Sequence, residues 1–171
     1  MEYMFLRILT ANTATIDVKG ESTIAGHATD MELLSYSIGV SNPVQPSPSN
    51  VGRTSGRPNF GEMVISKKLD ATSVLLSFYC AQAKNLGKVS LYLVRQDSEG
   101  ANQQDLTYMT YDLEQTLISS VSVGGSGDIP IETVTLNYSK ITWTYTPQKD
   151  DMTAEGAIPK YWDQATNTGT A

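Results

Sequence analysis

The sequence predicts an all-β fold: a β-barrel of two packed, mainly antiparallel sheets, with one short α-helix and one long extended loop. The first observation is that about seven or eight short segments carry apolar side chains at alternate positions, the period of a strand with one buried face. The second is that glycine-rich or polar turns separate these segments. Such a series of short strands in one chain is typical of a sandwich or a barrel.

Size and composition indicate one ordinary domain spanning residues 1–171. Apolar residues make up 40% of the chain and charged residues 18%, which suffices for a proper core. The net charge of −6, with only 12 Lys and Arg residues, argues against a nucleic-acid partner, because that partner requires a basic surface. The single cysteine excludes an intrachain disulfide, so folding requires no oxidising compartment.

The N-terminal segment "MEYMFLRILTANTA" is apolar, but we interpret it as a first strand rather than as a signal sequence. Glu2 stands where a signal peptide carries positive charge, and Arg7 interrupts the apolar run. No apolar run approaches the roughly 20 residues that a membrane helix needs. The composition therefore predicts a cytoplasmic protein that does not insert into a membrane.

The expected strands follow the alternation along the chain. They are residues 3–10, 31–40, 62–69, 88–95, 106–113, 116–123 and 132–148. The segment 106–113, "LTYMTYDL", is rich in threonine and tyrosine, which suit a pleated, half-buried surface. The expected turns include "SEGAN" at 98–102 and "GGSGD" at 124–128.

The long segment 132–148, "ETVTLNYSKITWTYTPQ", changes the parity of its apolar positions half-way. The first half has them at even positions and the second at odd ones: Val134, Leu136 and Tyr138, then Ile141, Trp143 and Tyr145. Because strand side chains alternate between faces, either the strand bends or bulges near 139–140, or its halves belong to different surfaces. We expect a bent strand that turns a barrel corner and places the two sets in different surroundings.

The segment 31–40, "MELLSYSIGV", also has two faces. The side chains expected in the core are Leu34, Tyr36, Ile38 and Val40. The opposite face carries the small residues Ser35, Ser37 and Gly39. Small polar residues of this kind suit an ordinary outer surface that faces water.

One segment has helical rather than strand spacing. The stretch "DATSVLLSFYCAQAKNLG" predicts an amphipathic helix at about 72–84 that covers the open side of the barrel. Its expected stripe is Leu75, Phe78, Tyr79 and Gln82. Cys80 lies inside it, and we interpret this residue as a small buried hydrophobe. A cysteine nucleophile needs a histidine base, and nothing places His27, the only histidine, near it.

Residues 41–61, "SNPVQPSPSNVGRTSGRPNFG", form the predicted long loop. Its four prolines withhold backbone donors, and so long a loop in a compact domain is uncommon and is usually functional or disordered. One interpretation is a floppy surface loop; the other, which we favour, is an arm that orders against a neighbouring subunit. The expected contact residues are Val44, Pro46, Pro48, Arg53 and Arg57. Residues 149–171 are expected to form a C-terminal tail.

No catalytic set is visible. A zinc site needs several His, Cys or carboxylate ligands, and the chain has one His and one Cys. The nucleophile elbow GxSxG and the phosphate-binding GxxxxGK are missing, and "GGSG" at 124–127 lacks the lysine. We therefore predict no catalytic residues, no metal and no cofactor, and a binding or structural protein rather than an enzyme.

An ordered series of motifs resembles the haemolysin-coregulated protein family, Hcp, the tube protein of bacterial type VI secretion. The series is "DVKGES" at 17–22, His27 with "MELLSYSIG", "ISSVSVGGSG" at 118–127, the segment 132–148, and "GAIPKYWDQATN" at 156–167. It spans nearly the whole chain, and the order is more specific than any single motif. The chain departs from the family at Ile38, where members often carry an aromatic residue, and in its proline-rich loop.

The resemblance implies hexameric rings with a wide channel, stacked into a tube that resembles a phage tail tube. It implies a VgrG spike, sheath and baseplate proteins and effector cargo as partners, and export from the bacterial cytoplasm without a cleaved signal peptide. On this reading Ser35, Ser37 and Gly39 face the lumen and the loop 41–61 makes ring contacts. Two alternatives remain: a monomeric β-sandwich module that binds carbohydrate or peptide, and an enzyme whose site is not recognisable.

Overall fold

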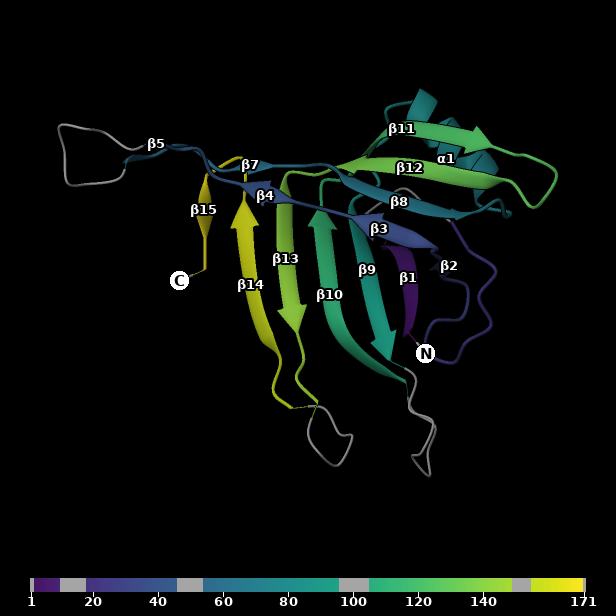
Figure 1. The fold of residues 1–171 in the computed structure, drawn as a ribbon, viewed down its shortest axis with the longest axis horizontal. Coiled ribbons are helices and arrows are strands. Elements are labelled where there is room, and N and C mark those ends of the chain that lie inside the picture. The colour runs from purple at the N-terminus through teal and green to yellow at the C-terminus, as the bar shows by residue number, and fades with distance from the viewer. Residues whose placement is uncertain (1, 10–17, 46–53, 96–104, 149–154, 171) are drawn as a thin grey trace.

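The computed structural model describes residues 2–9, 18–45, 54–95, 105–148 and 155–170. Two antiparallel sheets pack against each other, with one helix beside the smaller sheet and a thin ribbon extending from the body (Figure 1). This confirms the predicted fold of two packed sheets, one short helix and an extended segment. In the described ranges the strands form these two sheets and two further two-stranded pairs, and strand pairing closes none of them into a barrel.

The larger sheet has seven strands in the order β15-β14-β13-β10-β9-β1-β2. Their bounds are β1 Glu2–Leu9, β2 Met31–Glu32, β9 Lys88–Arg95, β10 Leu106–Glu114, β13 Lys140–Tyr145, β14 Ile158–Asp163 and β15 Thr168–Gly169. The expected strand 88–95 is confirmed residue for residue. The two C-terminal strands correct the expected tail, because β14 pairs along its whole length with β13. Pro159 and the exposed side chains of β14 hide this strand from pattern reasoning.

The smaller sheet has four strands in the order β11-β12-β8-β3. Their bounds are β3 Ser35–Ser37, β8 Met63–Lys68, β11 Leu117–Gly124 and β12 Ile131–Asn137. Its strands run across those of the larger sheet (Figure 1), an arrangement in which chains that switch sheets form the corners. The core between the sheets is one cluster of apolar side chains, including Leu6, Ile65, Leu91, Leu113, Val134 and Leu136.

The segment 132–148 is two strands in two sheets rather than one bent strand. β12 belongs to the smaller sheet and β13 to the larger one, and the chain crosses between them at 138–139. The expected separation of the two apolar sets is wrong for most of them: Val134, Leu136, Tyr138 and Ile141 all lie in the same core. The parity of the buried positions changes because the chain passes from one sheet to the other, and its opposite side then faces the core that the two sheets share.

The same kind of crossing corrects the expected core face of 31–40. The backbone N–H of Leu33 donates to Met4 in the larger sheet, whereas the N–H of Leu34 donates to Ser66 in the smaller one. Leu33 is therefore buried, and Leu34, expected in the core, is 45% exposed. Tyr36 and Ile38 do pack against the core, as expected. The last member of the expected set, Val40, lies beyond the sheet and is 58% exposed.

The helix, α1, spans Ser73–Ala81 and is shorter than the expected 72–84. Asp70 orders its start by accepting hydrogen bonds from the backbone N–H and the hydroxyl of Thr72. Leu76 and Tyr79 are buried, and the helix packs against β11. Of the expected stripe, Tyr79 is correct, but Phe78 is 55% exposed. Cys80 packs partly buried against the core, the place expected for a small hydrophobe.

The predicted loop 41–61 contains two short antiparallel pairs, which make it a ribbon. β4 Val40–Ser41 pairs with β7 Asn59–Phe60, and β5 Val44–Gln45 pairs with β6 Thr54–Ser55. We call these four strands and the described residues between them, 40–45 and 54–60, the arm; they extend from the body toward the left of Figure 1. Within the described ranges, no helix is long and apolar enough to cross a membrane.

Candidate assembly interface

The outer face of the four-stranded sheet carries two rows of small, mostly hydroxylated side chains. Strand register aligns the first row as Ser35, Ser66, Thr133 and Ser122. It aligns the second as Ser37, Val64, Thr135 and Ser120. We call these eight positions the hydroxyl face. None of them is charged, and across the first row the hydroxyl oxygens of Ser35 and Ser66 lie 2.7 Å apart.

Alternation explains why these residues face outward. The side chains that alternate with them on β8 and β12 are buried in the core, among them Ile65, Val134 and Leu136. The structure thus places the predicted Ser35 and Ser37 where they were expected, on the side of the sheet opposite the core. Sequence reasoning missed their neighbours on β8, β11 and β12. The alternating small residues of "SSVSV" and "TVTLN" were a signal, but only strand register shows that they share a face.

The third residue predicted for this face, Gly39, lies at the base of the arm. Its carbonyl accepts a hydrogen bond from the N–H of Gly61, 2.8 Å away. It is exposed, and a Cβ at this position would meet no atom within 4 Å. Gly39 is therefore at the border of the hydroxyl face rather than in one of its rows.

The base of the arm is anchored to the larger sheet. The ring of Phe60 lies 6.1 Å from Trp143 and 6.4 Å from Trp162, measured between centroids. The guanidinium of Arg57, predicted as an intersubunit contact, donates to the backbone carbonyl of Gln164 in the same chain. Of the other predicted contact residues, Val44 lies in β5, and Pro46, Pro48 and Arg53 are outside the described residues.

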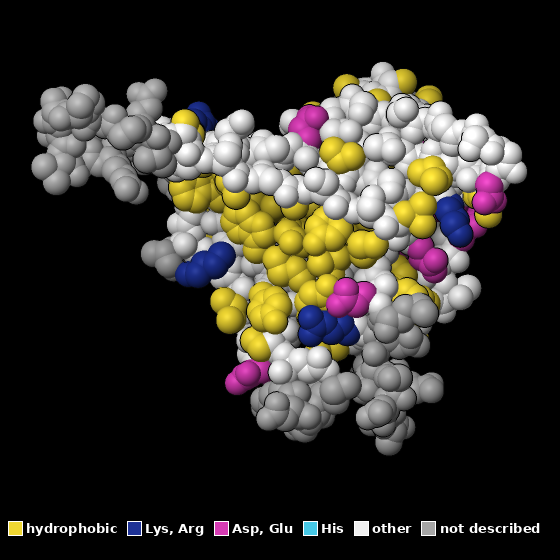
Figure 2. Space-filling view, viewed as in Figure 1, with side chains coloured by type: hydrophobic (Ala, Val, Ile, Leu, Met, Phe, Trp, Pro, Cys, Tyr) yellow, Lys and Arg dark blue, Asp and Glu magenta, His cyan; other side chains and the backbone are white. Residues whose placement is uncertain are grey.

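A hollow lies beneath the arm base, where the larger sheet extends past the smaller one. Its volume is about 170 Å³, and its walls include Ile38, Val40, Phe60, Tyr111, Tyr138 and Trp143. We call it the aromatic groove. Figure 2 shows apolar side chains gathered on this side of the molecule, below the arm and the smaller sheet. Burial raises the pKa of Tyr138 to about 12, and burial together with a hydrogen bond to Tyr36 does the same for Tyr111, so both phenols are neutral.

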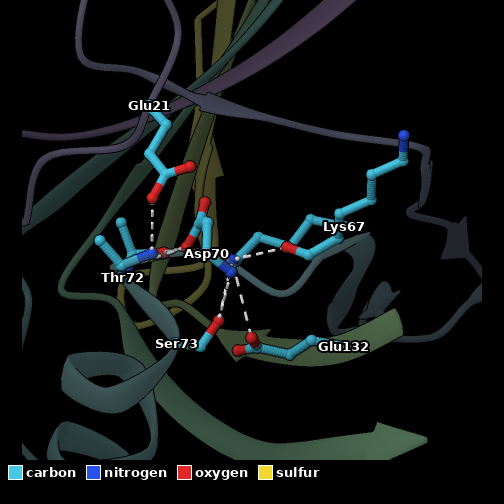
Figure 3. Close-up of polar contacts among 8 residues, drawn as sticks. Glu21, Lys67, Asp70, Thr72, Ser73 and Glu132 are labelled. Atoms are coloured by element: carbon cyan, nitrogen blue, oxygen red, sulfur yellow. Dashed lines mark hydrogen bonds and ion pairs between the residues drawn. The ribbon is translucent and has the colours of Figure 1, made fainter. Parts of the chain in front are cut away.

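A buried ionic cluster joins the smaller sheet to the start of the helix (Figure 3). The ammonium of Lys67 lies 2.7 Å from an Asp70 carboxylate oxygen, 3.3 Å from the Ser73 hydroxyl and 3.6 Å from a Glu132 carboxylate oxygen. Lys67 and Glu132 are fully buried cross-strand partners. Burial opposes the charged form of Asp70, but hydrogen bonds from Lys67 and Thr72 outweigh it and lower the pKa of that carboxyl.

His27 belongs to a second polar cluster, which fastens the segment before β2 to β1. Its Nδ1 lies 2.9 Å from an Asp30 oxygen, and Arg7 donates to both oxygens of that carboxylate. The imidazole stacks on Phe5 at 4.4 Å. These contacts give the histidine a structural role. Across the described ranges, no group of three or more His, Cys, Asp or Glu residues is placed to hold a metal ion.

With this geometry established, comparison with known proteins gives a consistent answer. The family model described as "Type VI secretion system effector, Hcp" matches residues 5–145. The chain belongs to the Hcp family. A relative from Pseudomonas aeruginosa, protein hcp1, is 33% identical over 147 residues, which cover 85% of this chain and 88% of the relative. The resemblance seen in the motifs is confirmed, and the chain is an Hcp tube protein of type VI secretion.

Solved structures share the Hcp fold over almost the whole chain. A type six secretion system protein superposes with a TM-score of 0.85 at 24% identity, covering 99% of this chain and 100% of that one. Hcp1 from Salmonella typhimurium gives a TM-score of 0.71 at 23% identity, with 99% of each chain covered. A type VI secretion system effector from Yersinia pestis gives 0.68 at 22% identity, covering 94% of this chain and 98% of that one.

Proposed function

We propose that this Hcp chain is the structural subunit of a type VI secretion tube. Its copies close into hexameric rings, the rings stack, and the assembled protein is itself exported from the bacterial cytoplasm without a cleaved signal peptide. The lumen carries and protects effector proteins, and the tube works with a VgrG spike and with sheath and baseplate proteins. Membership of the Hcp family supports a role in type VI secretion, and the hydroxyl face supports a ring with a water-filled lumen.

The proposal rests on the hydroxyl face, which we assign to the wall of the channel. A channel that passes varied proteins must stay wet without holding any one of them tightly. Serine and threonine hydroxyls both donate and accept hydrogen bonds, so they interact with many partners and commit to none. An uncharged wall also avoids long-range attraction or repulsion of cargo of either sign. Ser35 and Ser37 lie in this wall, with Gly39 at its border.

Size in solution tests the ring. We expect sedimentation velocity to show a species about six times the 18.6 kDa chain mass at micromolar concentration or above, and electron microscopy to show rings. The alternative, a monomeric β-sandwich binding module, would sediment near 18.6 kDa. A strictly monomeric protein across the micromolar range would contradict the proposed ring.

The channel wall is tested by Ser37→Gln, which enlarges a wall residue without adding charge. Because Ser37 is exposed and no core contact changes, rings should assemble normally. Co-purification of effectors with rings from the producing bacterium, quantified by mass spectrometry, should fall. Thr23→Gln, at an exposed position before β2, is the matched control and should retain cargo.

Two results would contradict the lumen assignment. If Ser37→Gln prevents ring formation, the residue lies in a packed interface between subunits. If assembly and cargo retention are both unchanged, Ser37 is not part of the surface that meets cargo.

A further inference from the structure

The helix α1 has an apolar outer surface that the described part of the chain leaves exposed. Val74 is 76% exposed and Phe78 is 55% exposed, although the opposite side of the helix is buried through Leu76 and Tyr79. Val74 and Phe78 are four residues apart, so they are neighbours on the helix surface. No charged side chain occurs within 73–81. The two residues form a convex, uncharged ridge, which we call the helix ridge.

The aromatic groove has the complementary shape and size. It is concave, and its lining residues are apolar or tyrosine, with no charged side chain among them. An apolar cavity of about 150 Å³ holds a benzene molecule, so a groove of about 170 Å³ has room for one phenylalanine ring. Burying an aromatic anchor in a desolvated pocket is the usual centre of a protein–protein contact.

The ridge and the groove lie at opposite edges of the four-stranded sheet. The helix packs on β11, one edge strand, whereas the groove lies beneath residues 38–40, which continue β3, the other edge strand. A chain therefore cannot fill its own groove with its own ridge. Two different complementary patches on one chain produce a head-to-tail contact, and such contacts close into a ring when the rotation permits.

We infer that Phe78 of one copy occupies the aromatic groove of the next copy, with Val74 covering the groove's rim near Val40. This inference rests on the proposed ring and specifies one contact that closes it. The occupant is a second copy of this chain. The ridge is small beside the roughly 800 Å² that each partner of a stable interface buries, so Phe78 is the anchor within a larger contact between adjacent sheet edges.

The first experiment removes the anchor and measures assembly. Phe78→Ser should raise the concentration at half-assembly, measured by sedimentation, by about 30-fold or more, the usual effect of losing an interface anchor. Its melting temperature at low protein concentration should match that of the unsubstituted chain, because the Phe78 side chain is exposed in a single copy. The control is Ile129→Ser: this side chain is also 55% exposed, but it lies in the β11–β12 turn and should leave assembly unchanged.

The second experiment identifies the partner surface. In a Cys80→Ser background, Val74→Cys combined with Val40→Cys should give a ladder of covalent oligomers with a short bismaleimide, ending at the ring. Each single cysteine should give only uncross-linked chains. A covalent dimer from Val74→Cys alone would show a ridge-to-ridge contact and overturn the inference.

The outcomes separate this contact from the ring itself. If the unsubstituted chain forms rings but Phe78→Ser assembles equally well, or the double-cysteine chain gives no ladder, the ridge and groove do not meet and the ring stands. If the unsubstituted chain is monomeric at every concentration, the proposed ring fails and the inference fails with it.

Discussion

Replacing Lys67 with methionine is expected to lower the free energy of unfolding by about 3–5 kcal/mol, the usual cost of removing one partner of a buried ion pair. The Lys67 side chain is fully buried and interacts with Asp70, Ser73 and Glu132. Methionine fills similar space but leaves the Glu132 carboxylate buried without a countercharge. Equilibrium unfolding in urea at one fixed protein concentration measures the change, because oligomerisation makes stability concentration-dependent.

The neighbouring lysine supplies the matched control for Lys67. Lys68 is exposed, so Lys68→Met should change the free energy of unfolding by no more than about 0.5 kcal/mol. The double variant Lys67→Met with Glu132→Leu should recover the part of the loss that comes from the fully buried Glu132 carboxylate, whereas the partly exposed Asp70 still lacks its ammonium partner. Equal stability of the Lys67→Met and Lys68→Met variants would contradict the role assigned to the buried pair.

Replacing residues 44–56 of the arm with a short Gly-Ser linker is expected to abolish secretion while leaving the body folded. Of the replaced residues, those that the structure describes (44–45 and 54–56) are not in the core cluster, and the β4–β7 pair with Phe60 at the base of the arm is kept. Loops of this kind carry little of the core energy, so the melting temperature should change by only a few degrees. Export to the medium should fall to the level of a strain without a working secretion apparatus, because we expect the arm to make the contacts between stacked rings.

Two measurements on the arm variant locate the defect. Sedimentation shows whether single rings still form, and electron microscopy shows whether they stack. Secretion of the variant at the normal level would remove the arm from the mechanism. A collapse of the melting temperature would instead show that the arm stabilises the body, contrary to its position outside the core.

The sequence pattern was sufficient to predict the buried and exposed faces of a strand that stays in one sheet and packs one face on the core. The alternation of Val89, Leu91 and Leu93 predicts β9 to the residue, and all three side chains lie in the core. The hydroxyl-rich pattern of "SYS" predicts an outward face for Ser35 and Ser37, which the structure confirms as exposed. The ordered series of motifs was sufficient to identify the Hcp family. In these places each residue's side of the strand is decided within the strand itself.

Only the tertiary structure decided where the chain changes sheet. The crossing between Leu33 and Leu34 was not recognised from the spacing. The crossing at 138–139 does change the parity of the apolar positions, but the spacing alone does not distinguish a bent strand from a change of sheet. The strand β14 exists because β13 offers it a full hydrogen-bonded edge, in spite of Pro159. The hydroxyl face and the aromatic groove likewise join segments distant in sequence. Alternation tells which side of its own strand a residue occupies, whereas the neighbouring strand and its register are selected by packing of the shared core.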